Sequence, residues 1–277
     1  MNKTSIEWTA FSANPIKYRQ LSDGKTVWAC VKTSPGCANC YSETIALRFN
    51  RGKLFNARNM EEVEPFLCDA ESRKMRTAKT ISGERVSGSR CFIGDMTDIF
   101  GEWISDDLLN QLFSNVLEIR TDVTWQILTK RAERMSKYLQ WRWGDGRIPS
   151  RNIHVGVSCE NQQTANERIL HLLRCQAAVR FVSHEPMLDY ADPVPGIDWW
   201  IIGCESSGRK VGRLGKFRDD LDWQEAAARV VHQCRVHGVS PFVKQCPVGT
   251  RVSHDPNEWI EECRVREFPE LESAKAE

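Results

Sequence analysis

The hydrophobic pattern of this chain alternates between short, fully apolar runs and longer stretches with one apolar face. Short apolar runs bounded by polar turns are typical of strands covered on both faces. Apolar residues that recur every three or four positions are typical of helices. The pattern predicts strands at residues 91–94, 124–128, 153–157, 179–182, 199–202 and 241–244. It predicts helices at residues 106–120, 132–139, 162–174 and 223–237.

Strands that alternate with helices favour right-handed βαβ units and a parallel sheet, which indicates the α/β class. A partial or full (β/α) barrel of parallel strands fits best, and an open doubly wound sheet is the alternative. We expect residues 1–246 to form one such domain and residues 247–277 to be a C-terminal extension. Residues 27–29, or an earlier segment, would supply the first strand. Residues 73–90 contain six Lys and Arg, and we expect a solvated loop there.

Polar and ionisable side chains follow almost every predicted strand. In both candidate architectures the carboxyl ends of parallel strands meet at one rim, where ligands bind. We therefore expect these side chains to lie together around one cavity. The candidates are Asp95, Asp98, Lys130, Arg131, Ser158, Cys159, Glu160, Glu185, Cys204, Glu205 and Lys244.

Composition narrows the cellular compartment in which the protein is expected. The chain has 277 residues, a formal net charge of +1 and eleven cysteines. Its start carries no apolar signal-like region, and no run approaches the ~18 apolar residues of a membrane span. We therefore expect a cytoplasmic protein without membrane contact, whose thiols are reduced. A near-neutral charge gives no global sign of nucleic-acid binding.

Three cysteines near the N-terminus, Cys30, Cys37 and Cys40, have the spacing C-x6-C-x2-C. A C-x2-C pair closes readily around one metal centre, and the turn-forming residues 34–36 can bring Cys30 back to face the pair. No fourth ligand is obvious nearby, so the coordination shell is expected to have an open position. The alternatives are a [4Fe-4S] cluster with one open iron, a zinc site with a distant fourth ligand, or three unrelated buried thiols.

Eight short sequences, in order over residues 4–246, resemble those of a known family. On these motifs the chain resembles the phage and bacterial family of uncharacterised three-cysteine proteins related to radical S-adenosylmethionine (SAM) enzymes. The usual radical SAM spacing is C-x3-C-x2-C; here the first gap is six, and the C-x2-C half followed by an aromatic is retained. The matching sequences are TSIEWT (4–9), SPGCANCY (34–41), GDMTDIFG (94–101), QILTKR (126–131), VGVSCEN (155–161), VSHEP (182–186), IGCESSG (202–208) and FVKQ (242–245).

The resemblance implies a radical SAM-like barrel in which Cys30, Cys37 and Cys40 bind three irons of a [4Fe-4S] cluster. SAM would bind the fourth iron and, after one-electron reduction, yield a 5′-deoxyadenosyl radical. Asp95 or Asp98 would hold the SAM ammonium or sulfonium, or else act as a turn or cap carboxylate.

Further roles follow from the same resemblance, each with a structural alternative. Lys130 or Arg131 would meet the SAM carboxylate or a substrate phosphate, or be an exposed cation. Ser158 and Glu160 would hold the ribose hydroxyls, unless Ser158 only caps the next helix. Glu185 and Glu205 would grip SAM or substrate.

The remaining three candidates are Lys244, Cys159 and Cys204. Lys244 is expected to act in catalysis or to be a buried cation paired with Glu185 or Glu205. Cys159 and Cys204 would face the cavity and deliver a hydrogen atom to a substrate radical, or be small buried hydrophobes.

Two functions of different class remain. The first is a radical SAM-type enzyme of a bacterial or phage-infected cytoplasm. It would take electrons from a flavodoxin or ferredoxin and act on a nucleotide or nucleic-acid base. The second is a non-catalytic, zinc-binding phage protein that binds nucleic acid or a protein partner. The zinc protein needs a fourth ligand near the three cysteines, with Cys68 or Cys91 the first to test.

Overall fold

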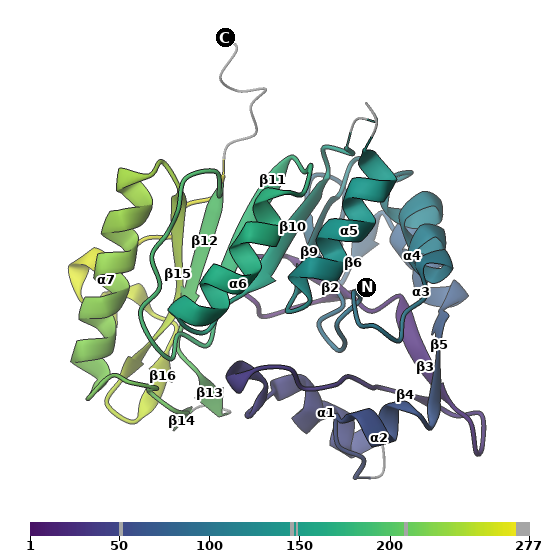
Figure 1. Ribbon diagram of the computed structural model, residues 1–277, viewed down its shortest axis with the longest axis horizontal. Helices are drawn as coiled ribbons and strands as arrows, with labels where there is room; N and C mark the ends of the chain where they lie inside the picture. Colours follow the sequence, from purple (N-terminus) through teal and green to yellow (C-terminus); the bar gives the residue numbers. More distant parts are fainter. Residues whose placement is uncertain (50–51, 145–146, 148, 208–209, 270–277) are drawn as a thin grey trace.

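One large sheet of mostly parallel strands organises the protein (Figure 1). The computed structural model describes residues 1–49, 52–144, 147, 149–207 and 210–269. In these residues the parallel strands lie side by side in the order in which the chain visits them. They are β2 (Phe11–Ala13), β8 (Arg90–Ile93), β9 (Thr124–Thr129), β10 (Ile153–Ser158), β11 (Val179–His184), β12 (Trp199–Gly203) and β15 (Ser240–Val248).

Antiparallel strands extend this sheet at both edges. Within the described residues no pairing joins β2 to β15, so the sheet does not close into the full barrel that was one of the expectations. The class is therefore α/β with an open, mostly parallel sheet. The added strands are β1 (Asn2–Lys3) beside β2, and β16 (Arg251–Ser253), β14 (Lys210–Val211) and β13 (Ser206–Ser207) beyond β15.

Four long amphipathic segments cover one face of the sheet (Figure 1). Right-handed crossovers that all run in the same direction place their helices on the same side. Their apolar faces pack on the strands, with Leu109, Leu139, Leu172 and Val230 fully buried. The segments are α4 (Asp106–Leu112) with the π-helical turn Phe113–Leu117, α5 (Ala132–Trp143), α6 (Gln162–Leu173) and α7 (Asp220–Val236).

Aromatic side chains fill the opposite face of the sheet. Phe92, Phe181, Trp199 and Phe242 come from the strands, and Trp8 packs among them from the N-terminal segment. Phe268, near the other end of the chain, closes the same cluster.

The C-terminal segment therefore belongs to the domain rather than extending from it, in contrast to the expected boundary at 246. Strand β15 continues to Val248 and pairs with β16, and Phe242 pairs with Arg266. Burial of Trp259 and Cys263 accounts for this docking. Two short turns, η3 (Pro256–Glu258) and η4 (Glu261–Cys263), lie in this segment. Residues 270–277 lie outside the described part.

The segment between β2 and β8 carries structure that the periodicity did not predict. It contains a separate antiparallel sheet and several short helices, too short to show a hydrophobic period. Residues 73–90, expected to be a loop, include part of a helix and a hairpin. The first parallel strand is β2, an earlier segment than residues 27–29, as the second of the two expectations had it. The elements are β3 (Ile16–Gln20), β4 (Thr26–Val27), η1 (Pro35–Cys37), α1 (Tyr41–Phe49), α2 (Ala57–Met60), β5 (Val63–Leu67), α3 (Asp69–Thr77), β6 (Thr80–Ile81) and β7 (Glu84–Arg85).

The predicted strands and helices themselves are confirmed to within a few residues. The clearest difference is the helix predicted at 106–120, which changes to π-helical turns from Phe113. None of the helices in the described ranges is long and apolar enough to span a membrane.

Candidate functional site

The three N-terminal cysteines line one cavity of about 150 Å³ at the carboxyl ends of β8, β9 and β10. Five residues predicted from the strand ends line it with them: Asp95, Asp98, Lys130, Arg131 and Ser158. The rest of the wall consists of Val31, Ser42, Phe55, Gly94, Met96, Thr97, Leu128 and Thr129. Eight of the fourteen candidate residues thus surround a single space.

Hydrogen bonds from the strand ends hold the cysteine-bearing segment across the rim. The Ser34 hydroxyl donates to Glu160 over 2.7 Å, and the Asn39 amide donates to Glu205 over 2.8 Å. Gly36 lies so close to Glu160 that a Cβ on it would be 2.5 Å from the Glu160 side chain. A larger residue at position 36 would therefore push this segment off the rim.

Three more contacts tie the backbone on either side of the cysteines to neighbouring strand ends. The Arg131 guanidinium donates to the Val31 carbonyl over 2.9 Å, and the Thr97 hydroxyl donates to the Ala29 carbonyl over 2.8 Å. Arg213 donates to the Pro35 carbonyl over 2.8 Å. The segment is thus fixed by polar contacts from β8, β9, β10 and the region after β12.

The three thiols are free and partly buried. Burial raises the pKa of Cys30 to about 12, with the nearby Asp98 carboxylate acting in the same direction. In the described part of the chain, no three His, Cys, Asp or Glu side chains lie close enough together to hold one metal ion. Neither Cys68 nor Cys91 is among the residues that line the cavity, and Cys91 is fully buried in the core.

Asp95 is the acidic side chain of the cavity wall that lacks a cationic partner among the described residues. Its carboxylate accepts a hydrogen bond from the Asn14 amide. Its backbone carbonyl accepts from the hydroxyls of Tyr41 and Ser42 over 3.0 and 2.5 Å. Burial raises the pKa of Asp95 above its usual value. A cation placed in the cavity would lower that pKa again, so this carboxylate is suited to binding a positive charge.

Asp98 and Arg131, by contrast, bind each other. The Asp98 carboxylate accepts from Arg131 over 3.1 Å and from the Thr129 hydroxyl over 2.6 Å. Arg131 also reaches Glu102 over 2.8 Å and stacks on the ring of Trp103. With these partners both side chains stabilise the rim and the segment at Val31.

Lys130, Ser158 and Glu160 form a second network beneath the cysteines. The Lys130 ammonium lies 2.6 Å from both the Ser158 hydroxyl and the Glu160 carboxylate. Arg168 from α6 reaches Glu160 over 3.2 Å, and Glu160 is fully buried. Burial alone would raise the pKa of Glu160, but Lys130 and Arg168 hold it below its usual range. Sequence reasoning missed Arg168, although it interrupts the apolar face of a predicted helix.

Two further ion pairs stand on the far side of the rim. Glu185 and Glu205 follow β11 and β12, and Lys244 lies within β15. Lys244 donates to Glu185 over 2.6 Å. This is the pairing that one of the two expectations for Lys244 predicted. Burial would lower the pKa of Lys244, but Glu185 more than offsets this and raises it. Glu205 is bound by Arg213 over 2.6 Å, which was not foreseen because Arg213 lies in no predicted element.

Cys159 and Cys204 do not line the cavity. They are 0 and 1% exposed and belong to the main hydrophobic core. Burial raises the pKa of both thiols to about 12. Successive residues of a strand point to opposite faces, so Ser158 faces the cavity while Cys159 turns away from it. Both thiols therefore match the alternative expectation, in which they are small buried hydrophobic side chains.

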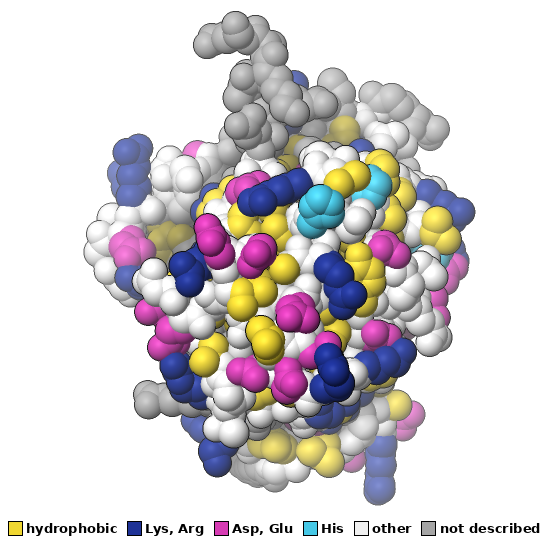
Figure 2. Space-filling model, turned by 90° about the vertical axis from the view of Figure 1, so that its left-hand side faces the viewer, with side chains coloured by type: hydrophobic (Ala, Val, Ile, Leu, Met, Phe, Trp, Pro, Cys, Tyr) yellow, Lys and Arg dark blue, Asp and Glu magenta, His cyan; other side chains and the backbone are white. Residues whose placement is uncertain are grey.

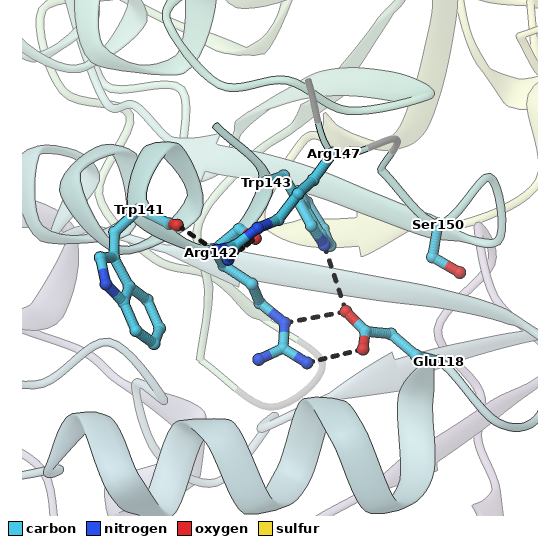
Figure 3. Close-up of a pocket in the computed structure, with 6 residues that line it drawn as sticks. All are labelled: Glu118, Trp141, Arg142, Trp143, Arg147 and Ser150. Atoms are coloured by element: carbon cyan, nitrogen blue, oxygen red, sulfur yellow. Dashed lines mark hydrogen bonds and ion pairs between the residues drawn. The ribbon is translucent and has the colours of Figure 1, made fainter. Parts of the chain in front are cut away.

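A larger hollow, of about 410 Å³, lies at the other end of the sheet, between the end of α5 and the segment before β10 (Figure 3). In Figure 3 the Arg142 guanidinium faces the Glu118 carboxylate, at 2.8 and 2.6 Å, and Trp143 donates to the same carboxylate over 3.1 Å. These charged groups already bind one another, and no residue predicted for chemistry lies here. The cysteine cavity is therefore the candidate site.

The fold and the site define an α/β protein with an open, mostly parallel sheet and a three-cysteine cavity at the strand ends. A family model described as "Protein of unknown function (DUF5131)" matches residues 3–261, and the chain belongs to this family. No curated protein and no solved structure matches the chain.

Proposed function

We propose that this protein is an iron–sulfur enzyme of the radical SAM type, built on an open, partial (β/α) barrel. The observation that carries the proposal is the common cavity of Cys30, Cys37 and Cys40 at the carboxyl ends of the strands. Strands that neighbour each other in chain order, with helices on one face, have the topology of a barrel opened between its first and last strands. In barrels of this kind the active site lies at that rim.

The donor set suits a [4Fe-4S] cluster. Such clusters are held by cysteine thiolates, and three thiols leave one iron open. When bound, the cluster would supply the electron that cleaves a C–S bond of SAM to form a 5′-deoxyadenosyl radical, which takes a hydrogen atom from the substrate. Cys30, whose pKa is raised to about 12, would release its proton to solvent as its thiolate binds iron.

The residues of the cavity wall divide into binding and positioning groups. Asp95, without a cationic partner in the described residues, would bind the ammonium of SAM. Glu160 and Arg131, bound by Lys130 and Asp98, would keep the cysteines in place. The Glu185–Lys244 pair would contact the substrate, for which we propose a nucleotide or nucleobase.

The zinc-binding alternative makes a different demand on the same cysteines. Around a tetrahedral zinc with bonds of ~2.3 Å, the thiolate sulfurs lie ~4 Å apart. The three cysteines would have to draw together and recruit a fourth ligand, because no three His, Cys, Asp or Glu side chains of the described residues lie close enough to hold one metal ion.

Electron paramagnetic resonance of the anaerobically reduced protein, with and without SAM, tests the proposal. We expect a cluster signal that changes when SAM is added. Asp95→Asn should keep the signal and require more SAM to change it, whereas Asp107→Asn, on the exposed surface of α4, should behave as wild type. A protein that holds zinc and shows no cluster signal would refute the radical SAM assignment.

A further inference from the structure

Four residues on the aromatic side of the sheet carry buried polar atoms without a hydrogen-bond partner. Gln126 is 0% and His154 6% exposed, and in the described residues neither the Gln126 amide nor the His154 ring meets a partner. The indole nitrogen of Trp8 and Nε of Arg90 are likewise buried and unpartnered. These six atoms are half of the twelve such atoms in the described part of the chain. Because buried polar groups are nearly always hydrogen-bonded, this concentration points to a bound ligand.

The strand register places three of these residues side by side. Gln126 of β9 pairs with Phe92 of β8 on one side and with His154 of β10 on the other. Register partners point to the same face of a sheet, and so does Arg90, two residues before Phe92. Since Phe92 belongs to the aromatic cluster, Arg90, Gln126 and His154 all point to that face.

Trp8 covers the same region from the N-terminal segment. Its ring centroid lies 4.9 Å from that of Phe92 and 6.1 Å from that of Phe181. Phe92 stands on β8 and Phe181 on β11, so a ring that reaches both lies across β9 and β10 between them. Trp8 therefore covers the strands that carry Gln126 and His154.

The positive charge of Arg90 has no carboxylate beside it among the described residues. Its guanidinium stacks on Phe268, 3.7 Å from the ring centroid, and burial lowers its pKa with no acidic group to offset the effect. Arg90 also helps burial to lower the pKa of His154, so the two groups lie close together. By contrast, the α7 side of the molecule shows acidic and basic side chains interspersed (Figure 2). A bound anion would supply the counter-charge that Arg90 lacks.

The groups of this region select a small oxyanion among possible ligands. The Arg90 guanidinium, the Gln126 amide and the Trp8 indole all offer N–H donors. Water would satisfy these donors but would bring no counter-charge, and a metal cation would be repelled by Arg90. A large ligand is excluded because Trp8, Gln126 and His154 are at most 6% exposed.

We propose that four residues bind a small oxyanion of the carboxylate or phosphate class: Trp8, Arg90, Gln126 and His154. Arg90, the first residue of β8 and the only one of the four that is partly exposed, marks the entrance. Leu128, two residues beyond Gln126, lines the cysteine cavity and packs against the aromatic cluster. The oxyanion site thus lies beneath the cysteine cavity, with Leu128 between them. The inference does not rest on the proposed function.

Thermal unfolding of the full chain in chloride buffer, with added inorganic phosphate or added acetate, tests the site. The melting temperature should rise with the concentration of the oxyanion that binds, and the comparison of the two identifies its class. Arg90→Gln should weaken this binding at least about tenfold, because it removes the charge that the oxyanion meets.

A second variant and a matched control keep the test independent of Arg90. Gln126→Met preserves the size of the side chain and removes both unpartnered atoms. Without oxyanion it should melt no lower than the wild type, and it should gain less when oxyanion is added. Arg180 also has a buried, unpartnered Nε, but it precedes Phe181 and so points to the opposite face of β11. Arg180→Gln should respond to oxyanion as the wild type does.

The second readout is the nitrogen NMR signals of the His154 ring, identified by their absence from His154→Gln. They should shift on addition of the oxyanion and saturate over the same concentrations as the melting temperature. An equal rise in the wild type, Arg90→Gln and Gln126→Met would be a general salt effect and would overturn the inference. So would a wild type that responds to neither phosphate nor acetate, or His154 signals that do not shift.

Discussion

Replacing Glu160 by Gln is the change whose effect the structure predicts most fully. Glu160 is fully buried, and its carboxylate meets Lys130 at 2.6 Å, Arg168 at 3.2 Å and the Ser34 hydroxyl at 2.7 Å. The side chains of Lys130 and Arg168 are themselves only 18 and 8% exposed. Glu160→Gln keeps the shape of the side chain but leaves two buried cations without their counter-charge.

The magnitude follows from what an unpaired buried charge costs. Removing one partner of a buried ion pair typically destabilises a protein by ~3–5 kcal/mol. For a domain of this size, about 1 kcal/mol shifts the melting temperature by ~2–4 °C. We therefore expect Glu160→Gln to melt at least ~6 °C below the wild type. Glu133→Gln removes the exposed Glu133–Lys137 pair and should melt at the same temperature as the wild type.

The direction in which stability changes with pH tests the same prediction. The folded-state pKa of Glu160 lies below its unfolded value, so its contribution to stability is present above about pH 4 and is lost as pH falls through the folded pKa. Urea unfolding of wild type and Glu160→Gln should differ most near neutral pH and converge in acid. A difference under about 0.5 kcal/mol at pH 7 would refute the claim that this network stabilises the rim.

Three further predictions follow from burial and pairing. Asp95→Asn should weaken SAM binding about tenfold or more while the iron content stays that of the wild type, because it removes a charge and not a cluster ligand; equal SAM titrations would contradict this. Cys159→Ala and Cys204→Ala should each lower the free energy of unfolding by ~1–2 kcal/mol without changing iron content, and lost iron in either would show that the thiol is a ligand. Burial lowers the pKa of His154 to about 4, so the native state binds fewer protons than the unfolded state below about pH 6.5, and this histidine alone should lower stability by ~2 kcal/mol from pH 7 to pH 5. In urea unfolding, the free energy of unfolding of His154→Gln should fall less between pH 7 and pH 5 than that of the wild type. An equal fall in both proteins would contradict the prediction.

Strand ends were the part of the site that sequence could predict. Asp95, Lys130 and Ser158 follow apolar strands, and the parallel arrangement brings them to one rim whatever the loops do. The pairings could not be predicted, because they join residues far apart in the chain. Ser34 meets Glu160 and Asn39 meets Glu205 only once the cysteine segment has folded across the rim.

The expectations that the structure corrects have local causes. Cys159 was expected either to face the cavity or to be a small buried hydrophobe; strand β10 extends one residue further than predicted, to Ser158, and Cys159 after it is buried in the core. Residues 247–269 lack a long apolar period, although the buried Trp259 and the aromatic contact of Phe268 attach them to the sheet. Short elements such as β4 and β6, of two residues each, carry no period to detect.

Iron and acid-labile sulfide per chain, measured in anaerobically purified protein, test the central claim most directly. The account predicts about four of each in the wild type and their loss in Cys37→Ser, with Cys175→Ser, a buried core thiol, keeping the wild-type content. About one zinc and no sulfide in the wild type, or full iron content in Cys37→Ser, would contradict it.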